Sequence, residues 1–257
     1  MKTLPTLPSE LQSIKKEIKK LYYKGDISLL QKEKIVIVGS RRPYNYTKNL
    51  VFELSSKLSK AGICIVSGGA MGVDAIAHKG AGAKNSIAVM GNGLNHIYPK
   101  INTNLIKDIG ENGLLLSQFE PDFVATPWSF VLRNKVITAL GKIVIIAQAD
   151  LNSGSMKSAE FAIKQNKEIF VLPHRCKESE GTNYLLKNGY AKAIYDIDEF
   201  VSNFAQTKHQ PPVKDEFWEF CQRSPRYEDA VKIYKDKIFE AELNGDIIVK
   251  NGVIQVC

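Results

Sequence analysis

The stretch IVSGGAMGVDAIAHKG, from Ile65 to Gly80, holds three glycines within five residues, at positions 68, 69 and 72. An apolar run precedes them and apolar residues at helical spacing follow, which predicts a strand, a tight turn and a helix. Because glycine lets a backbone approach a ligand and a helix N-terminus attracts anions, this turn suits a phosphate. The same pattern also fits a ligand-free turn in which Asp74 caps the helix.

The alternation of strand and helix continues on both sides of this stretch. Apolar runs predict strands at 34–39, 63–69, 86–91, 114–119, 142–149 and 168–173. Helical spacing is found between them, at 46–62, 73–82, 102–113, 130–141 and 155–167, and shorter helices are expected at 181–191 and 198–205. Strands that read as continuous apolar runs with helices between them pair in parallel. The expected fold class is α/β, an extended Rossmann-like, doubly wound, mostly parallel sheet.

Unusual residues gather after these strands, at the sheet edge where doubly wound folds bind ligands. They form four segments: GSRRP at 39–43, SGGAMG at 67–72, GNG at 91–93 and SGS at 153–155. Adjacent arginines at such an edge suit phosphate oxygens. The stretch WSFVLRNKVI places two aromatic residues before Arg133, Asn134 and Lys135, the combination that binds single strands. Trp128 is expected in the core, whereas Phe130 fits either the core or a base.

Composition and charge limit the classes of protein. The chain has 257 residues, 44% of them hydrophobic, and no apolar run of membrane-spanning length or secretory signal. The four cysteines form no CxxC pair, which favours reduced thiols in a cytoplasmic protein. The net charge of +8 makes a polyanionic partner plausible, yet 208–257 carries 8 basic against 9 acidic residues.

The pattern changes near QTKHQPPVK at 206–214, which has the composition of a linker. We expect four parts: a short N-terminal helical segment at 1–20, a Rossmann-like domain at 21–205, a linker at 206–213, and a small winged-helix-like domain at 214–257. The last part ends in an expected hairpin through Asn251 and Gly252.

Motifs of cofactor chemistry are missing from the sequence. It contains no GxxxxGK[ST], no HExxH and no GxSxG, and the strand at 86–91 ends without the carboxylate that would hold a ribose. We therefore expect no cofactor, no metal ligands, no catalytic residues and no enzymatic activity.

Seven stretches in order resemble the DprA/Smf family of DNA-processing proteins, over about residues 21–204: IVIVGSRRP, IVSGGAMGVDAIAH, GNGLNHIYP, LLLSQFEP, SFVLRNKVITAL, SGSMKSAEFA and EGTNYLL. The resemblance implies a sequence-independent single-stranded DNA-binding protein that forms a homodimer. It also implies that the protein protects incoming DNA and helps to load the RecA recombinase during natural transformation. The candidate DNA-binding residues are Ser40, Arg41, Arg42, Ser67, Gly68, Gly69, Gly72, Phe130, Arg133, Asn134, Lys135, Ser153, Gly154, Ser155 and Lys157.

The chain departs from the family pattern in three places. The usual Arg-Asn-Arg reads Arg133-Asn134-Lys135, the usual Val-Pro-Gly reads Leu172-Pro173-His174, and the N-terminal helical domain is reduced to about 20 residues. An alternative interpretation is a nucleotide phosphoribohydrolase-like enzyme on a similar scaffold, but its PGGxGTxxE motif here reads PHRCKESEGTNYLL, without the paired glycines and the glutamate. A third interpretation, a DNA-binding tail, is disfavoured by the tail's charge.

Overall fold

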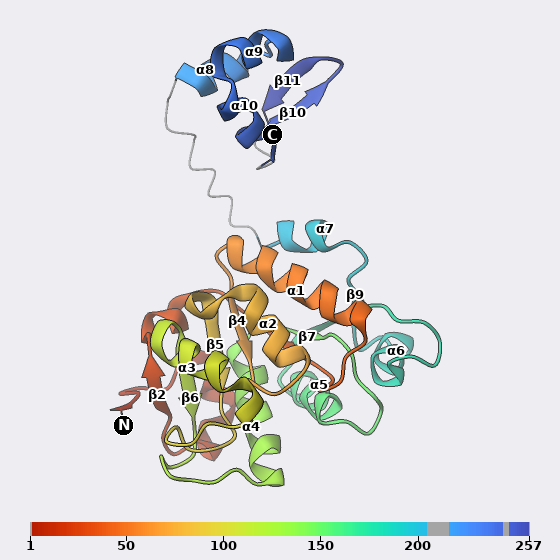
Figure 1. Cartoon of the computed structure of the whole chain (residues 1–257). Coiled ribbons are helices and arrows are strands. Elements are labelled where there is room, and N and C mark those ends of the chain that lie inside the picture. Colours follow the sequence, from red (N-terminus) through yellow and green to blue (C-terminus); the bar gives the residue numbers. More distant parts are fainter. Residues whose placement is uncertain (1, 205–215, 244–246, 257) are drawn as a thin grey trace. The chain divides into compact units, whose positions relative to one another are not determined.

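The computed structural model describes residues 2–204, 216–243 and 247–256. The chain divides into two compact units, Met1–Gln206 and Thr207–Cys257 (Figure 1). The first unit holds the special segments after the strands, and the second holds the expected winged-helix-like part.

A nine-stranded sheet forms the centre of the first unit, with the order β1-β2-β6-β5-β4-β3-β7-β8-β9. The strands from β6 to β9 in this order are parallel, while β1 and β2 are antiparallel additions at one edge. Their bounds are β1 Lys2–Thr3, β2 Tyr22–Gly25, β3 Lys34–Val38, β4 Cys64–Ser67, β5 Ser86–Val89, β6 Leu114–Ser117, β7 Ile143–Ile146, β8 Glu168–Val171 and β9 Lys192–Ala193.

Helices cover both faces of this sheet (Figure 1). The helices are α1 Asn45–Lys60, α2 Val73–Ala81, α3 Thr103–Asn112, α4 Pro127–Leu140, α5 Gly154–Lys164, α6 Glu180–Lys187 and α7 Ile197–Ser202. Short 3₁₀ helices lie at η1 Ser9–Glu17, η2 Ile27–Gln31, η3 Ala83–Asn85 and η4 Lys100–Asn102. The expected α/β fold class is confirmed, and each helix expected between two strands is present.

Alternation along the strands divides the core into two layers. On β3, Ile35 and Ile37 pack in the layer with α1, α2 and α7, whereas Val36 and Val38 pack in the layer with η1, α4 and α5. Every residue of β3 is buried, which is why these runs show no polar alternation. The parallel strands all end at one edge, so the loops that follow them converge there.

The N-terminal stretch belongs to the same compact unit as the sheet. It forms β1, η1 and β2 rather than a run of α-helix, and Leu11 and Ile14 of η1 are buried in the core layer of α4. The sequence pattern did not predict β1 or β2. Tyr22 pairs with Ser117 at the carboxyl end of β6, so β2 begins beside the ligand-binding edge of the sheet.

The second unit contains three helices and a hairpin in its described residues. These are α8 Glu216–Gln222, α9 Tyr227–Tyr234, α10 Asp236–Leu243, β10 Ile247–Lys250 and β11 Val253–Val256. The expected hairpin is confirmed, because Lys250 pairs with Val253 and both Asn251 and Gly252 have positive φ. An isolated antiparallel β-bridge joins Arg226 to Val253 of β11. Three helices followed by a hairpin are the order of elements expected of a winged helix. The linker expected at 206–213 lies outside the described residues.

Candidate nucleic-acid interface

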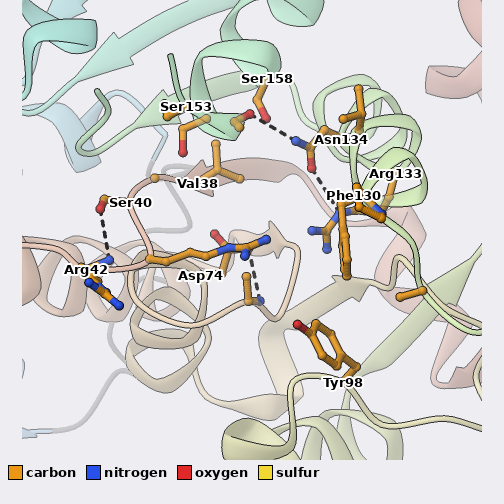
Figure 2. A pocket seen from close by; sticks show the side chains of 18 of the residues that line it. Val38, Ser40, Arg42, Asp74, Tyr98, Phe130, Arg133, Asn134, Ser153 and Ser158 are labelled. Atoms are coloured by element: carbon orange, nitrogen blue, oxygen red, sulfur yellow. Dashed lines mark hydrogen bonds between the residues drawn. The ribbon is translucent and has the colours of Figure 1, made fainter. Parts of the chain in front are cut away.

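A pocket of about 1100 Å³ lies at the carboxyl edge of the sheet (Figure 2). It is lined by loops that follow different strands and by the first turns of α4 and α5. Nine of the predicted residues line it: Ser40, Arg41, Arg42, Phe130, Arg133, Asn134, Ser153, Gly154 and Ser155. Gly68 lines a small hollow that shares Arg41, Phe130 and Arg133 with this pocket.

Arg133 is a buried cation in the wall of the pocket, only 4% exposed. Its Nη1 donates to the carbonyl oxygens of Gly68 at 2.6 Å and Val89 at 2.7 Å. Burial lowers the pKa of Arg133 to about 10, partly opposed by the carboxylate of Asp74, so the side chain remains charged at neutral pH. The guanidinium therefore ties the turn after β4 to the end of β5 and supplies positive potential to the pocket.

Asp74 occupies the anion position that the glycine-rich turn creates. Its Oδ2 accepts hydrogen bonds from the backbone N–H groups of Gly68 at 3.1 Å and Ala70 at 3.4 Å. Burial raises the pKa of Asp74, while Arg133 and these N–H groups act in the opposite direction. Asp74 does not cap α2, whose N-cap is Gly72 without a side-chain hydrogen bond; instead its carboxylate takes two N–H groups of the turn that precedes the helix.

The glycines of this turn serve close packing within the protein. A Cβ on Gly68 would collide with Nη1 of Arg133 and would lie 2.7 Å from Oδ2 of Asp74. Gly72 has a φ of +77°, and a Cβ there would collide with the carbonyl oxygen of Ser40. The turn is thus packed against Arg133 on one side and against the GSRRP loop on the other.

An exposed arginine and a partly exposed ring form the open part of the pocket. The guanidinium carbon of Arg41 lies 5.9 Å from the ring centre of Phe130, and that of Arg133 lies 5.7 Å from the same centre. Tyr98 extends this group, with its ring centre 5.6 Å from that of Phe130 (Figure 2). Phe130 therefore lies within 6 Å of two cations and of a second aromatic ring.

The opposite wall comes from the start of α5. Asn134 accepts a hydrogen bond from Nε of Arg133 at 3.2 Å and donates to the carbonyl oxygen of Gly154 at 3.3 Å. Ser153 is the N-cap of α5, since its hydroxyl accepts from the N–H of Met156 at 3.3 Å. The helix therefore begins at Gly154, one residue before the expected start at 155.

Five predicted residues line neither the pocket nor the small hollow. Ser67 is fully buried and donates its hydroxyl to Ile37 at 2.6 Å. Lys135 bonds Glu17 at 2.5 Å instead, because two residues beyond Arg133 a helical side chain points to the far side. The others are Gly69, Gly72 and Lys157, and Lys157 pairs with Glu160 at 2.8 Å.

Several lining residues were missed by the sequence pattern. Tyr98 follows the GNG segment, but nothing in its spacing marked it as a neighbour of Phe130. Gln148 is buried at the end of the run 142–149, where its Oε1 accepts from the N–H of Tyr44 and the hydroxyl of Thr47, both at 2.9 Å. His174, which stands where the family pattern has glycine, belongs to the same network, because its Nε2 lies 3.0 Å from Oγ1 of Thr47. A polar residue ending an otherwise apolar strand was the available signal for Gln148.

Trp128 is more exposed than expected. The sequence analysis placed it in the core, but 52% of it is accessible. Its ring packs edge-to-face against Phe119 and Phe123, with ring centres 5.7 and 5.6 Å apart. The two phenylalanine rings, both from the loop before α4, thus support the indole of Trp128 without burying it.

The fold and the pocket define a Rossmann-like α/β protein with an arginine-bearing pocket at the carboxyl edge of its sheet. Residues 2–205 match the family described as DNA recombination-mediator protein A. The chain belongs to this family, which confirms the resemblance seen in the sequence and gives it a DNA-processing, recombination-mediator role.

Curated relatives agree with this assignment. The chain is 34% identical over 208 residues to the DNA processing protein DprA of Bacillus subtilis, covering 79% of this chain and 70% of that protein. It is 35% identical over 197 residues to protein Smf of Escherichia coli, covering 75% of this chain and 52% of that protein. The match thus spans about half the length of the Escherichia coli relative.

Two solved structures resemble this fold. DNA processing protein A from Helicobacter pylori, described for its single-stranded DNA binding mode, matches with a TM-score of 0.77 and 45% identity, over 79% of this chain and 94% of that one. DprA from Streptococcus pneumoniae matches with a TM-score of 0.71 and 33% identity, over 77% of this chain and 71% of that one. Within the part of the chain that the structure describes, no helix is long and apolar enough to cross a membrane.

Proposed function

We propose that this chain binds single-stranded DNA, without sequence preference and without catalysis, in the pocket at the carboxyl edge of its sheet. The observation that carries the proposal is the proximity of Phe130 to the guanidinium groups of Arg41 and Arg133, whose central carbons lie 5.9 and 5.7 Å from its ring centre. A partly exposed ring near two cations suits a base on a phosphate backbone, since every base offers a face for stacking. The single-stranded DNA binding mode described for the Helicobacter pylori relative supports the same ligand.

Each part of the pocket has a distinct role in this proposal. Arg41 and Arg42 are exposed and pair with phosphates, while Phe130 stacks on a base. Arg133 is a positioning residue, because its Nη1 already donates to two carbonyl groups and its charge acts through the pocket wall. The serines at 153 and 155 offer hydroxyl groups at the opposite wall.

The first test replaces Arg41 with Ala and measures the affinity for oligothymidylate at several salt concentrations. Removing one phosphate contact should weaken binding of all sequences and reduce the slope of log K against log salt by about 0.7. Arg175→Ala, at an exposed arginine outside the pocket, is the matched control. Unchanged affinity and slope in Arg41→Ala would remove Arg41 from the site.

A second test concerns the ring. Phe130→Leu keeps an apolar side chain but removes the stacking face, and we expect a loss of about 1–3 kcal/mol in binding free energy. Phe130→Tyr keeps the face and should bind within about twofold of the wild type. Equal affinities for the wild type and Phe130→Leu would contradict the stacking role.

The finer biological role is also part of the proposal. We infer that the protein acts in the cytoplasm as a homodimer, protects incoming DNA and helps to load RecA onto it during natural transformation. Support comes from membership of the recombination-mediator family and from the DprA relatives. Sedimentation of the full chain tests the dimer, and RecA-dependent ATP hydrolysis on DNA coated with single-strand-binding protein tests loading. Release of a base from nucleoside monophosphates by the protein would instead favour the phosphoribohydrolase-like alternative.

A further inference from the structure

Outside the pocket, the surface of the first unit carries a dense group of lysines. Five exposed lysines fall within ten residues of η1, the following turn and β2: Lys15, Lys16, Lys19, Lys20 and Lys24. The one carboxylate in this stretch, Glu17, is bonded to Lys135 of α4 at 2.5 Å. Among the residues that the structure describes, none of the five lysines forms an ion pair. Lys24 lies against α3, where its Cδ is 3.5 Å from the position of a Cβ on Gly110, so we call the other four residues the lysine patch.

Trp128 lies in the first turn of α4, beside residues that line the pocket. Its neighbours Pro127 and Val131 line the pocket, so Trp128 stands at the outer rim. The ring is 52% exposed and is held from behind by Phe119 and Phe123. A supported and accessible indole is a stacking surface for a base.

The connection from Trp128 to the lysines runs through β2. Tyr22 pairs with Ser117 at the end of β6, and the hydroxyl of Tyr22 donates to Oε2 of Glu120 at 2.5 Å. Residues 19 and 20, which lead into β2, therefore lie beside the start of the segment 118–123 that supports Trp128. The ion pair between Lys135 and Glu17 anchors η1 to the helix that carries Phe130. This ion pair links η1, which carries Lys15 and Lys16, to α4, whose first turns line the pocket.

Two carboxylates lie on the same segment as Phe119. Glu120 accepts the hydrogen bond from Tyr22, and Oδ1 of Asp122 accepts one from Asn95 at 2.7 Å. Carboxylates in these positions disfavour a phosphate backbone. A strand that leaves the pocket over Trp128 is consequently directed toward η1, where cations outnumber carboxylates.

We propose that the lysine patch and Trp128 form a second contact surface for the same single strand, which binds the nucleotides flanking those in the pocket. This inference rests on the proposed function and extends the binding site from one pocket to a track. Bases beyond the pocket stack on Trp128, and the phosphates that follow pair with the lysines. The lysines act as point charges on flexible stems, so this contact is independent of sequence.

The test compares two lengths of oligothymidylate, about 6 nucleotides for the pocket alone and about 30 for pocket and track. The variant K15A/K16A/K19A/K20A removes four positive charges. Its matched control, K60A/K79A/K84A/K107A, removes four exposed lysines from α1, α2, η3 and α3, none of which lines the pocket. For the long oligonucleotide we expect the patch variant to bind at least about tenfold more weakly. Its salt slope should fall by about 0.7 for each lost phosphate contact.

Trp128 itself reports the stacking step. The chain has two tryptophans, and the other is Trp218 of the second unit. In a Trp218→Phe background, the long oligonucleotide should quench the indole fluorescence strongly. The quenching should decrease in the patch variant at equal occupancy of the pocket, because the flanking strand is then no longer held over the ring.

The outcomes separate this inference from the proposed function. If the patch variant binds both oligonucleotides with wild-type affinity and salt slope, the lysine patch is not a DNA surface, and an acidic protein partner becomes its occupant. If the patch variant and the control lose equal affinity for the long oligonucleotide, the effect is overall charge and the inference is overturned. If the wild type binds neither length, the proposed function itself fails.

Discussion

Gly68 shows how one residue can hold a binding pocket together without meeting a ligand. The space left by its missing side chain is filled by the guanidinium of Arg133 and the carboxylate of Asp74. Gly68→Ala would insert a methyl group between two buried charged groups, and we expect a loss of about 1–3 kcal/mol in unfolding free energy. Gly154→Ala is the control in urea unfolding, because a Cβ there meets nothing within 4 Å. Equal stability of the two variants would contradict this packing.

His78 gives the second prediction at this scale. It is fully buried on α2, neither ring nitrogen has a hydrogen-bond partner in the described part of the chain, and burial lowers its pKa to about 3. In the unfolded chain His78 binds a proton with a pKa of about 6.5, whereas in the folded chain it stays neutral down to about pH 3. The unfolding free energy therefore falls as the pH falls below 6.5. Between pH 7 and pH 5 the loss due to His78 should be about 2 kcal/mol.

The variant His78→Leu removes this titration. In urea unfolding at pH 7 and pH 5, its unfolding free energy should fall by about 2 kcal/mol less than that of the wild type over the same interval. The comparison is of differences within each protein, so any change in packing at pH 7 cancels. The same fall in both proteins would show that His78 is protonated in the fold.

Single residues of the site were predictable where they end a strand or share a helix face. Arg41 follows β3 and Phe130 lies one turn before Arg133, so strand order and helical spacing were enough to bring them together. Lys135 was predicted to bind DNA because of its charge. Its position two residues after Arg133 turns its side chain toward Glu17 instead. Tyr98 lies on a loop with no periodicity, and only the folded chain places it beside Phe130.

The first turn of α4 is the element that positions the aromatic part of the pocket. Ser129 accepts a hydrogen bond from the N–H of Thr126 at 3.0 Å and donates to the buried carbonyl of Gly91 at 2.6 Å. Ser129→Ala would remove one half of this capping box and leave the Gly91 carbonyl without that donor. We expect a loss of about 1–2 kcal/mol in unfolding free energy, with weaker oligonucleotide binding because Phe130 follows directly. Ser9→Ala, at an exposed serine, is the control, and matching stabilities would contradict a structural role for the box.

Helices and strands with a strong hydrophobic pattern were predicted well, whereas strands that form only because a neighbouring strand offers a free edge were not. The parallel strands are buried on both faces, so their apolar runs stand out in the sequence. β2 is only four residues long, with half of them exposed, and its existence depends on the free edge of β6. In the second unit, Lys235, with a φ of +35°, separates α9 from α10.

At the scale of the whole molecule, the two units have separate cores and unequal charge. Phe217, Ile238 and Ile254 belong to a core cluster of their own in the second unit. Residues 208–257 carry 8 basic and 9 acidic residues, whereas the chain as a whole carries +8. The positive charge that phosphates require therefore lies in the first unit.

This distribution predicts that a fragment of residues 1–206 keeps the DNA-binding activity. The fragment contains the pocket and the lysine patch, and it lacks only a segment of near-neutral charge. Its affinity for oligothymidylate should stay within about twofold of that of the full chain at two salt concentrations, with the same salt slope. Circular dichroism of the fragment checks that it is folded. A folded fragment that loses most of its affinity would instead place a major DNA contact in the second unit, in favour of the DNA-binding tail.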